Sequence, residues 1–582
     1  MNLYDLYLIS PQLAVACAGI LVILLDLVFQ RKGFLPYATF AGLMVAAALL
    51  VVQSIDLADA NDLVTDGNVR ATGVLVGSLS VDRFSLFFNF LVLAALGLVT
   101  LASVDYVKRM ENFRGEYFGL MLFSATGMML LASATELITV YISLELVTLP
   151  LAALSAFLMT SRSSEAGMKF LIVGAISSAV MLYGMALIYG FTGATKLDEI
   201  AEVVKSAAVL DTPFGGYALL VGVVLMLVGF GFKISAVPFQ MWVPDIYEGA
   251  PTPVVAFLSV ASKAAAVAVL IRVLFTGFFP IALDWASLIA VLAAASMTIG
   301  NLAAIGQSNI RRMFGYSTIA HAGYILVGIA AAVKTSGGDS GGPEFVSIGL
   351  NSVLFYLAAY VAANLTAFFA IIAISQRTGS DLIEGYGGLV RRAPFLVVAL
   401  TLALVALIGV PPTSIFIGKL VIFTAAVKSG LVWLAILGVI NSVVSAYYYV
   451  RIIRVMFLEE PKEQEGSKIS PVAWFALAVS GIAMIGIGIA PGFILRAAEI
   501  AVGDTVVVHG LGLLGLYGCA IAKARGARQV IGLDTVSDRL AISKKFGVDV
   551  TFDVGAMSDG DLVACVRAEC PPDGADVGIE VC

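Results

Sequence analysis

The feature that most constrains this chain is a succession of apolar stretches, each long enough to cross a lipid bilayer. A membrane-spanning helix needs about 20 predominantly apolar residues, and about fourteen such stretches follow one another before about residue 498. They cover residues 9–29, 35–54, 80–103, 115–133, 135–159, 168–192, 216–239, 251–276, 280–304, 311–333, 346–375, 391–428, 431–457 and 471–495. Of the 582 residues 60% are hydrophobic and only 13% are charged, which excludes an ordinary soluble globular domain. We therefore predict an all-α polytopic membrane protein with a membrane domain over residues 1–498.

Two of these stretches are interrupted by proline. The twelfth is too long for one straight helix and contains Pro411-Pro412, and the seventh runs into Pro238 and Pro244. Proline removes a backbone donor and clashes with the preceding turn, so we expect helices 7 and 12 to be broken. The breaks lie five spans apart, which predicts two inverted five-helix repeats, spans 4–8 and 9–13. Interrupted helices at matching positions of such repeats point to a transporter-type site near the midplane.

Charged residues lie inside several of these apolar stretches. They are Glu145, Lys233, Lys263 and Lys419. An ionisable side chain at mid-membrane costs about 2.5–3.5 kcal/mol on insertion scales, so such residues are kept mainly for ion paths, proton relays or buried pairs. We expect Glu145 and Lys233 to approach each other, because a buried carboxylate and a lysine exchange a proton as their geometry changes. The set indicates ion translocation.

Each of these residues also has a structural interpretation. Glu145 could be a carboxylate bonded to a neighbouring hydroxyl, and Lys419 could lie near a helix end and extend to the interface. His321, in the tenth stretch, suits proton relay because imidazole titrates near neutral pH, but a lone histidine is equally a packing residue. Arg272 lies close to a span end and is expected to be interfacial.

Basic residues are distributed unequally between the two sides of the membrane. About sixteen fall on alternate loops of one side and about six on the other, so the positive-inside rule makes the first side cytoplasmic. Both termini are then predicted on the outer side.

Three motifs give the chain a family resemblance. They are residues 232–253 (FKISAVPFQMWVPDIYEGAPTP), residues 309–324 (NIRRMFGYSTIAHAGY) and residues 409–419 (GVPPTSIFIGK). Residues 1–498 resemble subunit N of the proton-pumping NADH–quinone oxidoreductase, or respiratory complex I, an antiporter-like membrane subunit. The third motif departs from the family pattern, because Ile415 stands where the family has glycine, but it keeps Lys419.

The resemblance implies a function and a set of site residues. It implies fourteen helices in the bacterial inner membrane, translocating protons as quinone is reduced elsewhere in the complex. Glu145 and Lys233 correspond to the family's carboxylate–lysine pair in helices five and seven, Lys263 to the bridging lysine and Lys419 to the terminal lysine. The implied partners are other membrane and peripheral complex I subunits and the lipid bilayer, with no nucleic acid, no metal and no redox cofactor in this domain. A multi-subunit cation/proton antiporter shares the Glu–Lys–Lys set and remains the alternative.

The last eighty or so residues have a different character. Residues 503–509 predict a buried strand that leads into Gly510, Gly512 and Gly515 and then a helix. A second strand over residues 529–534 ends in Asp534. This order is typical of a dinucleotide-binding fingerprint, in which the glycines approach pyrophosphate and the acidic residue binds a ribose hydroxyl of NAD.

Residues 499–582 resemble part of the coenzyme domain of a medium-chain, alcohol-dehydrogenase-like oxidoreductase. We expect an incomplete α/β Rossmann-like fragment, because the chain stops before the remaining strands and has no zinc-binding catalytic domain. An NAD-dependent oxidoreductase is therefore the third interpretation, and it depends on this tail alone. We expect a fusion or an assembly artefact, without catalysis and with at most residual NAD binding.

Overall fold

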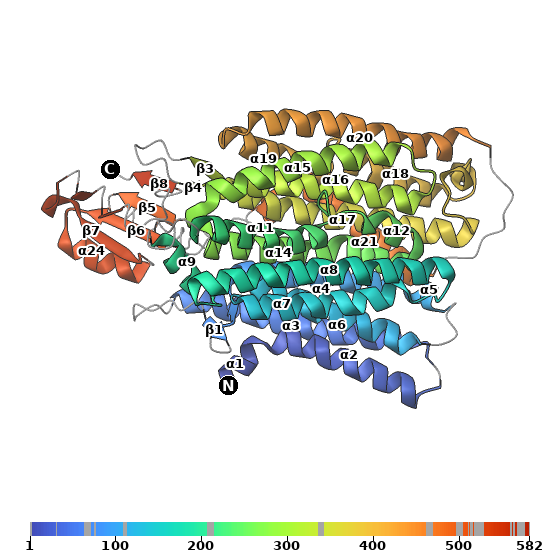
Figure 1. The fold of residues 1–582 in the computed structure, drawn as a ribbon, viewed down its shortest axis with the longest axis horizontal. Helices are drawn as coiled ribbons and strands as arrows, with labels where there is room; N and C mark the ends of the chain where they lie inside the picture. Colours follow the sequence, from blue (N-terminus) through green and yellow to red (C-terminus); the bar gives the residue numbers. More distant parts are fainter. Residues whose placement is uncertain are drawn as a thin grey trace.

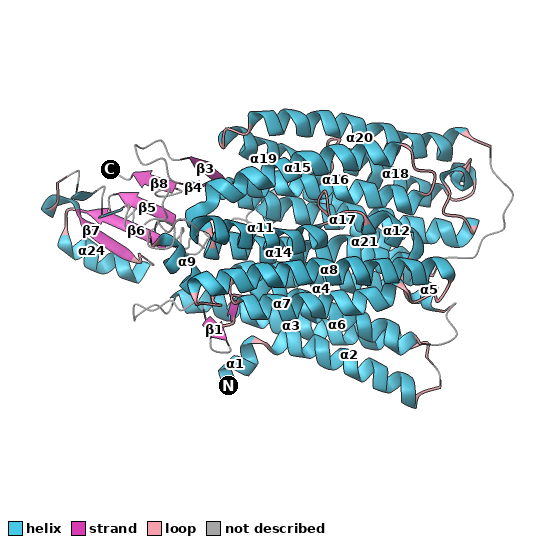
Figure 2. Cartoon of the chain, viewed as in Figure 1, coloured by secondary structure: helices cyan, strands magenta, loops and turns pink. Residues whose placement is uncertain are grey.

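The structure is a computed structural model that combines a large helical bundle with a small parallel sheet near the C-terminus (Figures 1 and 2). It describes residues 3–30, 32–62, 72–74, 77–108, 113–206, 215–335, 343–460, 470–495 and 497, and, in the tail, residues 505–509, 511, 516, 519, 529–546, 548–558, 561–562, 565–566 and 577–580.

Three long helices precede the predicted repeats. The elements of this part are α1 (Leu3–Leu8), α2 (Ser10–Val28), α3 (Leu35–Asp62), β1 (Thr72–Val74), β2 (Leu79–Val81), α4 (Arg83–Ala102) and α5 (Val104–Val107). Strands β1 and β2 pair in an antiparallel hairpin. Helix α4 begins at a capping box, in which the Asp82 carboxylate accepts from the Ser85 backbone N–H.

The first five-helix series follows. Its elements are α6 (Arg114–Ser133), α7 (Leu137–Ser155), α8 (Ser161–Thr192), α9 (Leu197–Lys205), α11 (Gly215–Ile234), α12 (Trp242–Gly249), α13 (Thr252–Phe257), η1 (Leu258–Ser262), α14 (Lys263–Arg272) and η2 (Val273–Gly277). The last four form one continuous span, in which η1 and η2 are π-helical turns.

The second five-helix series and the last membrane helix complete the bundle. Their elements are η3 (Phe279–Ile281), α15 (Ala282–Ile305), α16 (Ile310–Ala330), β3 (Val333–Thr335), β4 (Pro343–Phe345), α17 (Ser347–Thr378), η4 (Ile383–Tyr386), η5 (Leu389–Arg391), α18 (Pro394–Ile408), α19 (Ser414–Lys428), α20 (Val432–Leu458) and α21 (Pro471–Ile489). Thirteen helices of the described residues are long and apolar enough to cross a membrane. With the interrupted pair α18–α19 they make the fourteen spans that the sequence predicts.

Both predicted breaks are confirmed. Helix α11 ends at Ile234, the next residue Ser235 has a left-handed φ of 70°, and α12 begins only after Pro238. Helix α18 ends at Ile408, the next residue Gly409 has a φ of 91° that favours glycine, and α19 begins after Pro412. Each half of the twelfth span has 15 residues, too few to cross a bilayer alone.

Two spans form the centre of the bundle. The span Thr252–Gly277 and helix α17 are fully buried over their most apolar windows, whereas α2, α8 and α21 expose most of theirs. An exposed apolar helix face suits lipid contact, because lipid chains are as apolar as the side chains. Polar groups on the central spans are therefore held away from lipid.

The predicted tail fold is confirmed as a Rossmann-like fragment. Strands β5 (Thr505–His509), β6 (Gln529–Asp534), β7 (Val550–Asp553) and β8 (Val577–Glu580) form a parallel sheet in the order β7-β6-β5-β8, with helix α24 (Ser537–Ser543) and the short turns η6 (Lys544–Phe546) and η7 (Val554–Ala556). This is the 3-2-1-4 order of a nucleotide-binding fold. Figure 1 shows the sheet at the same end of the bundle as α1. The domain boundary near residue 499 lies outside the described residues.

Candidate functional site

Lys233 lies at the end of α11, directly before the break in the seventh span. Its Nζ donates a hydrogen bond to the Thr148 hydroxyl on α7. The same nitrogen lies 5.5 Å from the ring centroid of Phe232 and 5.7 Å from that of Phe170. Only 7% of the residue is exposed. The ammonium group is therefore enclosed by one hydroxyl and two aromatic faces.

Glu145 lies on α7 one helical turn before Thr148. Its charge acts on Lys233, but the hydrogen bond of Lys233 goes to Thr148 rather than to Glu145. The Oε1 atom of Glu145 is buried and has no hydrogen-bond partner among the described residues. Among the described residues Lys233 thus bonds the hydroxyl one turn beyond Glu145 and forms no ion pair with the carboxylate itself.

Lys263 is the first residue of α14 and follows the π-helical turn η1. Such turns interrupt the regular ladder and occur frequently at functional sites. Its Nζ donates to the backbone carbonyl oxygen of Thr318 on α16 at 2.6 Å and lies 5.9 Å from the Tyr360 ring centroid. Lys263 has no carboxylate partner in the described part of the chain, so the protein holds it by a backbone dipole.

His321 lies on α16, one turn after Thr318. Its Nδ1 is 2.7 Å from the Tyr356 hydroxyl on α17, and its ring centroid is 4.9 Å from that of Tyr360. The Tyr360 ring also faces Lys263, and the Tyr324 ring, 5.8 Å from the imidazole centroid, faces Lys419. His321 therefore shares one tyrosine ring with Lys263 and another with Lys419.

Lys419 lies on α19 and turns back towards the other half of the broken helix. Its Nζ donates to the Ile408 carbonyl at 2.8 Å and, more weakly, to that of Leu407 at 3.4 Å, and it lies 4.6 Å from the Tyr324 ring centroid. The last carbonyls of a helix have no intrahelical donor and carry partial negative charge. The break therefore creates the acceptor that holds Lys419.

The structure adds hydroxyl groups that the sequence did not single out. They are Thr148, Thr318, Tyr324, Tyr356 and Tyr360, all at most 2% exposed. The Thr318 hydroxyl joins two tyrosines, with 3.1 Å to the Tyr247 hydroxyl and 2.8 Å to that of Tyr360. The available signal was spacing: Thr148 follows Glu145 by three residues and Thr318 precedes His321 by three, which places each pair on one helix face.

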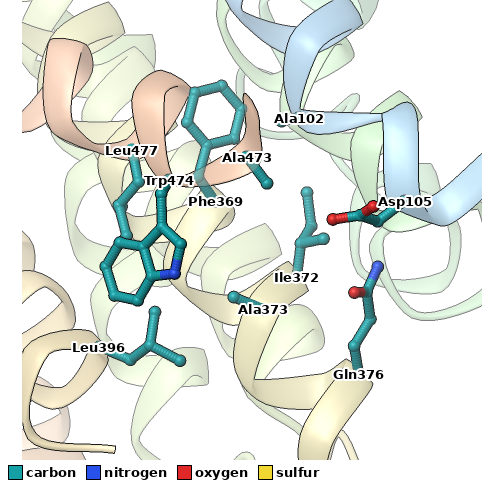
Figure 3. Close-up of a pocket in the computed structure, with 10 residues that line it drawn as sticks. All are labelled: Ala102, Asp105, Phe369, Ile372, Ala373, Gln376, Leu396, Ala473, Trp474 and Leu477. Atoms are coloured by element: carbon teal, nitrogen blue, oxygen red, sulfur yellow. The ribbon is translucent and has the colours of Figure 1, made fainter. Parts of the chain in front are cut away.

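A pocket lies apart from these residues, between α4–α5, α17, α18 and α21 (Figure 3). Phe369, Leu396 and Trp474 form its apolar wall, and Asp105 and Gln376 lie at its polar side. One Asp105 oxygen accepts from the Ser470 backbone N–H at 2.8 Å and the other from Lys108 at 3.0 Å. None of the buried lysines lines this pocket.

In the tail, Asp534 ends β6 as the fingerprint requires, but its carboxylate faces the backbone. One oxygen accepts from the Leu511 N–H at 2.6 Å and the other from the Val536 N–H at 2.9 Å. The residue is 5% exposed. Burial by itself raises the pKa of Asp534, but these backbone hydrogen bonds outweigh it and hold the pKa below its usual range. In this structure each Asp534 carboxylate oxygen therefore accepts from a backbone N–H group of the fragment itself. The fingerprint glycines Gly510, Gly512 and Gly515 lie outside the described residues.

Comparisons with known protein families separate the bundle from the tail. Residues 134–445 match the family described as NADH:quinone oxidoreductase/Mrp antiporter, TM. Residues 514–582 match the zinc-binding dehydrogenase family. The first match contains Glu145, Lys233, Lys263, His321 and Lys419, the five ionisable residues of the candidate site.

Individual relatives agree with the first match. The chain is 42% identical over 508 residues to NADH-quinone oxidoreductase subunit N of Dehalococcoides mccartyi, covering 86% of this chain and 100% of the relative. It is 39% identical to the protein of the same name from Desulforamulus reducens, covering 86% and 98%.

Solved structures share the fold. A chain of respiratory complex I from Thermus thermophilus matches with a TM-score of 0.67 and 31% identity, covering 84% of this chain and 99% of that one. A chain of the Mrp complex from Dietzia sp. matches with a TM-score of 0.72 and 22% identity, covering 86% and 97%, which shows the fold alone. On this evidence the chain belongs to the NADH-quinone oxidoreductase subunit N family.

Proposed function

We propose that this chain translocates protons across a membrane as a subunit of an NADH-quinone oxidoreductase, coupled to quinone reduction in other subunits. The observation that carries the proposal is the burial of Lys233, Lys263 and Lys419, each at most 7% exposed and none in direct contact with a carboxylate among the described residues. A buried ammonium held by neutral oxygens gives up its proton more readily than one fixed in a tight ion pair. These lysines are therefore suited to carry protons.

The proposed proton transfer begins at Glu145 and Lys233 and ends at Lys419, beside the break in the twelfth span. Glu145 and Lys233 exchange a proton as the Thr148 contact forms and breaks. Lys263 follows on the central span, and His321 relays between Lys263 and Lys419. Electron transfer takes place in other subunits, and we assign no redox centre to this chain.

The test is proton pumping by Glu145→Gln and Lys233→Ala variants in the complete complex. NADH-driven proton uptake into membrane vesicles is followed with a pH-sensitive dye. Both variants are expected to lower it by at least about a hundredfold, the usual contribution of a positioned proton-transfer group. The matched control is Lys196→Ala, a lysine paired with Glu199 at the surface. Normal pumping by Lys233→Ala would contradict the proposal.

A subunit of a multi-subunit cation/proton antiporter remains the alternative. The family description includes Mrp antiporters, and the fold likeness to the Mrp complex supports it. The two functions differ in what drives the protons. Uptake that needs NADH and stops with a quinone-site inhibitor supports the first, whereas sodium-driven proton exchange without NADH supports the antiporter.

We propose a bacterial inner membrane location, with the basic loops cytoplasmic and both termini outside. Support comes from the unequal distribution of basic residues on alternate loops. An epitope tag at the N-terminus should then bind antibody on intact spheroplasts. The proposed partners are lipid and the other membrane and peripheral subunits of the complex.

For the tail we propose no catalytic role and an origin by fusion or sequence assembly, with residues 499–582 as a separate fragment. The buried Asp534 carboxylate and the separate family match support this. The test is mass spectrometry of the protein from its native membrane. Peptides that span residues 490–520 would establish the fusion, and a chain ending near residue 500 would make the tail an artefact.

A further inference from the structure

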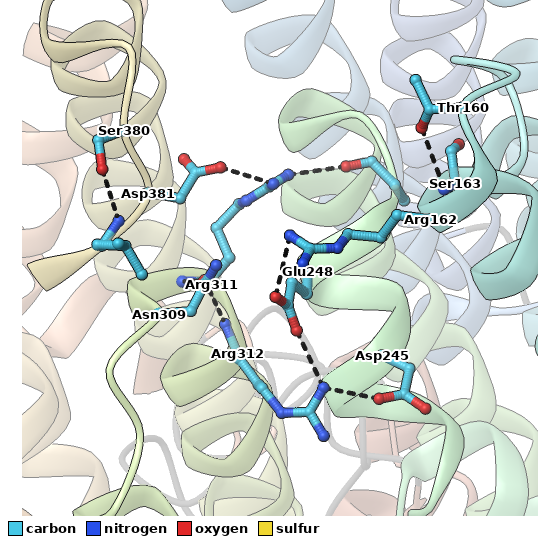
Figure 4. A network of polar contacts seen from close by, with 12 residues as sticks. Thr160, Arg162, Ser163, Asp245, Glu248, Asn309, Arg311, Arg312, Ser380 and Asp381 are labelled. Atoms are coloured by element: carbon cyan, nitrogen blue, oxygen red, sulfur yellow. Dashed lines mark hydrogen bonds and ion pairs between the residues drawn. The ribbon is translucent and has the colours of Figure 1, made fainter.

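Helix α12, the short helix after the break in the seventh span, is held by ion pairs to neighbouring helices (Figure 4). Asp245 lies 2.8 Å from Lys169 of α8 and 2.7 Å from Arg312 of α16. Glu248 lies 3.0 Å from the same Arg312 and 3.2 Å from Arg162 of α8. We call these five residues the α12 clamp.

Close packing fixes α12 against α8 as well. A Cβ atom placed on Gly249 would lie 2.7 Å from the Ala166 Cβ and 2.8 Å from the Arg162 carbonyl oxygen. These distances are too short for any larger side chain. Helix α12 therefore packs on α8 in one position, and the ion pairs of the clamp hold it in that position.

A short series of contacts leads from α12 to Lys233. Trp242, the first residue of α12, donates from Nε1 to the Phe232 carbonyl oxygen at 3.1 Å. Its ring centroid is 4.8 Å from that of Phe170 and 5.2 Å from that of Phe232. The rings of Phe170 and Phe232 are the two that face the Lys233 ammonium group. Phe170 also directly follows the clamp residue Lys169 in the sequence.

We propose that the α12 clamp is a positioning device for Lys233, acting through Trp242. The proposal rests on the proposed function, in which Lys233 carries protons. Arg312 lies in the first turn of α16, the helix that also carries Thr318 and His321, so the clamp connects the Lys233 side of the site with the Lys263 side. A shift of α16 relative to α8 would move α12, and with it the walls of Lys233.

The ordinary interpretation is a group of partly exposed ion pairs that contributes only stability. Isolated surface pairs contribute about 0–1 kcal/mol. Here one guanidinium bonds both carboxylates of the same short helix, and Lys169 joins Asp245 on the other side. The two interpretations differ in what they predict for Trp242, which carries no charge.

The experiment compares Asp245→Asn, Asp245→Glu and Trp242→Phe in vesicles that contain the complete complex. NADH-driven proton uptake is divided by the amount of assembled complex. Asp245→Asn is expected to lower this ratio about fivefold, the effect of about 1 kcal/mol, and Asp245→Glu is expected to restore it. Trp242→Phe keeps an aromatic ring but loses the hydrogen bond to Phe232, and a similar loss is expected. The double variant Asp245→Asn/Trp242→Phe should be no worse than either single variant, because both act on one path.

Two controls make the result decisive. Glu165→Gln removes the other ion pair of Lys169, at 2.7 Å, without contact to α12, and should pump normally. If Lys233→Ala abolishes pumping while Asp245→Asn and Trp242→Phe pump normally, the positioning role is wrong and the proposed function stands. If Lys233→Ala itself pumps normally, the proposed function fails first. Additive losses in the double variant would also overturn the positioning role. So would a loss of pumping in Glu165→Gln as large as that in Asp245→Asn.

Discussion

Lys233 donates its hydrogen bond to Thr148, one turn beyond Glu145 on α7, and not to Glu145 itself. The threonine hydroxyl in turn donates to the Leu144 carbonyl at 2.6 Å, so its orientation is set by its own helix. The hydroxyl oxygen thus offers the buried ammonium a neutral acceptor next to the carboxylate.

Thr148→Val should therefore impair proton pumping. Valine has the same shape but no acceptor, and a buried donor left without a partner costs about 1–3 kcal/mol. We expect NADH-driven proton uptake to fall about tenfold in vesicles with normal amounts of the complex. Thr148→Ser keeps the hydroxyl and should retain most of the activity. Equal rates for the serine and valine variants would show that the contact has no role in transfer.

The hydroxyl of Tyr356 is the partner of His321 Nδ1 at 2.7 Å. Tyr356→Phe removes only that oxygen and leaves the imidazole nitrogen unpaired in a closed interior. We expect proton uptake to fall about five- to tenfold, because a lost hydrogen bond of this kind costs about 1–1.5 kcal/mol. Tyr386→Phe is the matched control, since that buried tyrosine contacts Ser375 at 3.4 Å and not His321. If both variants pump alike, Tyr356 does not belong to the relay.

Gly409 provides the left-handed backbone conformation at the break in the twelfth span. Its φ is 91°, and a Cβ atom there would lie 3.0 Å from Lys419 Cδ. Gly409→Ala should therefore strain the backbone by about 1–2 kcal/mol and also displace Lys419 from the Ile408 carbonyl. Gly430→Ala imposes a similar strain, with a φ of 80°, where nothing lies within 4 Å of the added Cβ. We expect proton uptake to fall in the first variant only, while both lose some thermal stability.

How far the sequence predicted this site depends on the kind of residue. Charges in apolar spans are rare, so the sequence alone indicates Glu145, Lys233 and Lys263 as candidate site residues. The prolines predict both helix breaks because proline removes a backbone donor and clashes with the preceding turn. A hydroxyl inside a membrane helix is common, and its partner lies on another helix. Spacing places Thr148 on the same helix face as Glu145, but the contacts of Thr148 with Lys233 and of Tyr356 with His321 are seen only once the helices are packed together.

The partner of one charged residue near a span end could not be predicted from the sequence. The sequence predicts Arg272 at the membrane interface because it lies near a span end, and it gives no partner for the guanidinium. In the structure its guanidinium bonds both oxygens of Asp82 at 2.8 Å and 2.9 Å and also donates to the Ala132 carbonyl at 3.1 Å. Its side chain is 9% exposed. The partner comes from residues far earlier in the chain, which no local pattern reveals.

The pair of Asp82 and Arg272 should make stability depend on pH. Burial by itself raises the pKa of Asp82, but the charge and hydrogen bonds of Arg272, together with Ser85, outweigh it and bring the pKa below its usual range. A carboxylate with a lowered folded-state pKa adds stability above its unfolded-state pKa of about 3.9 and loses that contribution as the pH falls through the folded-state value. Asp82→Asn should therefore cost about 1–3 kcal/mol near neutral pH.

The measurement is the temperature at which the detergent-solubilised complex loses this chain, taken at pH 7 and at a series of values below pH 4. The wild-type protein should be the more resistant at pH 7, and the difference from Asp82→Asn should shrink as the acid protonates Asp82. Asp284→Asn, at an exposed acidic residue in the first turn of α15, should behave like the wild type at every pH. A difference between Asp82→Asn and the wild type that stays constant down to low pH would mean that the carboxylate charge is not what holds Arg272. The hydrogen-bonding shape of the Asp82 side chain would then account for the stability.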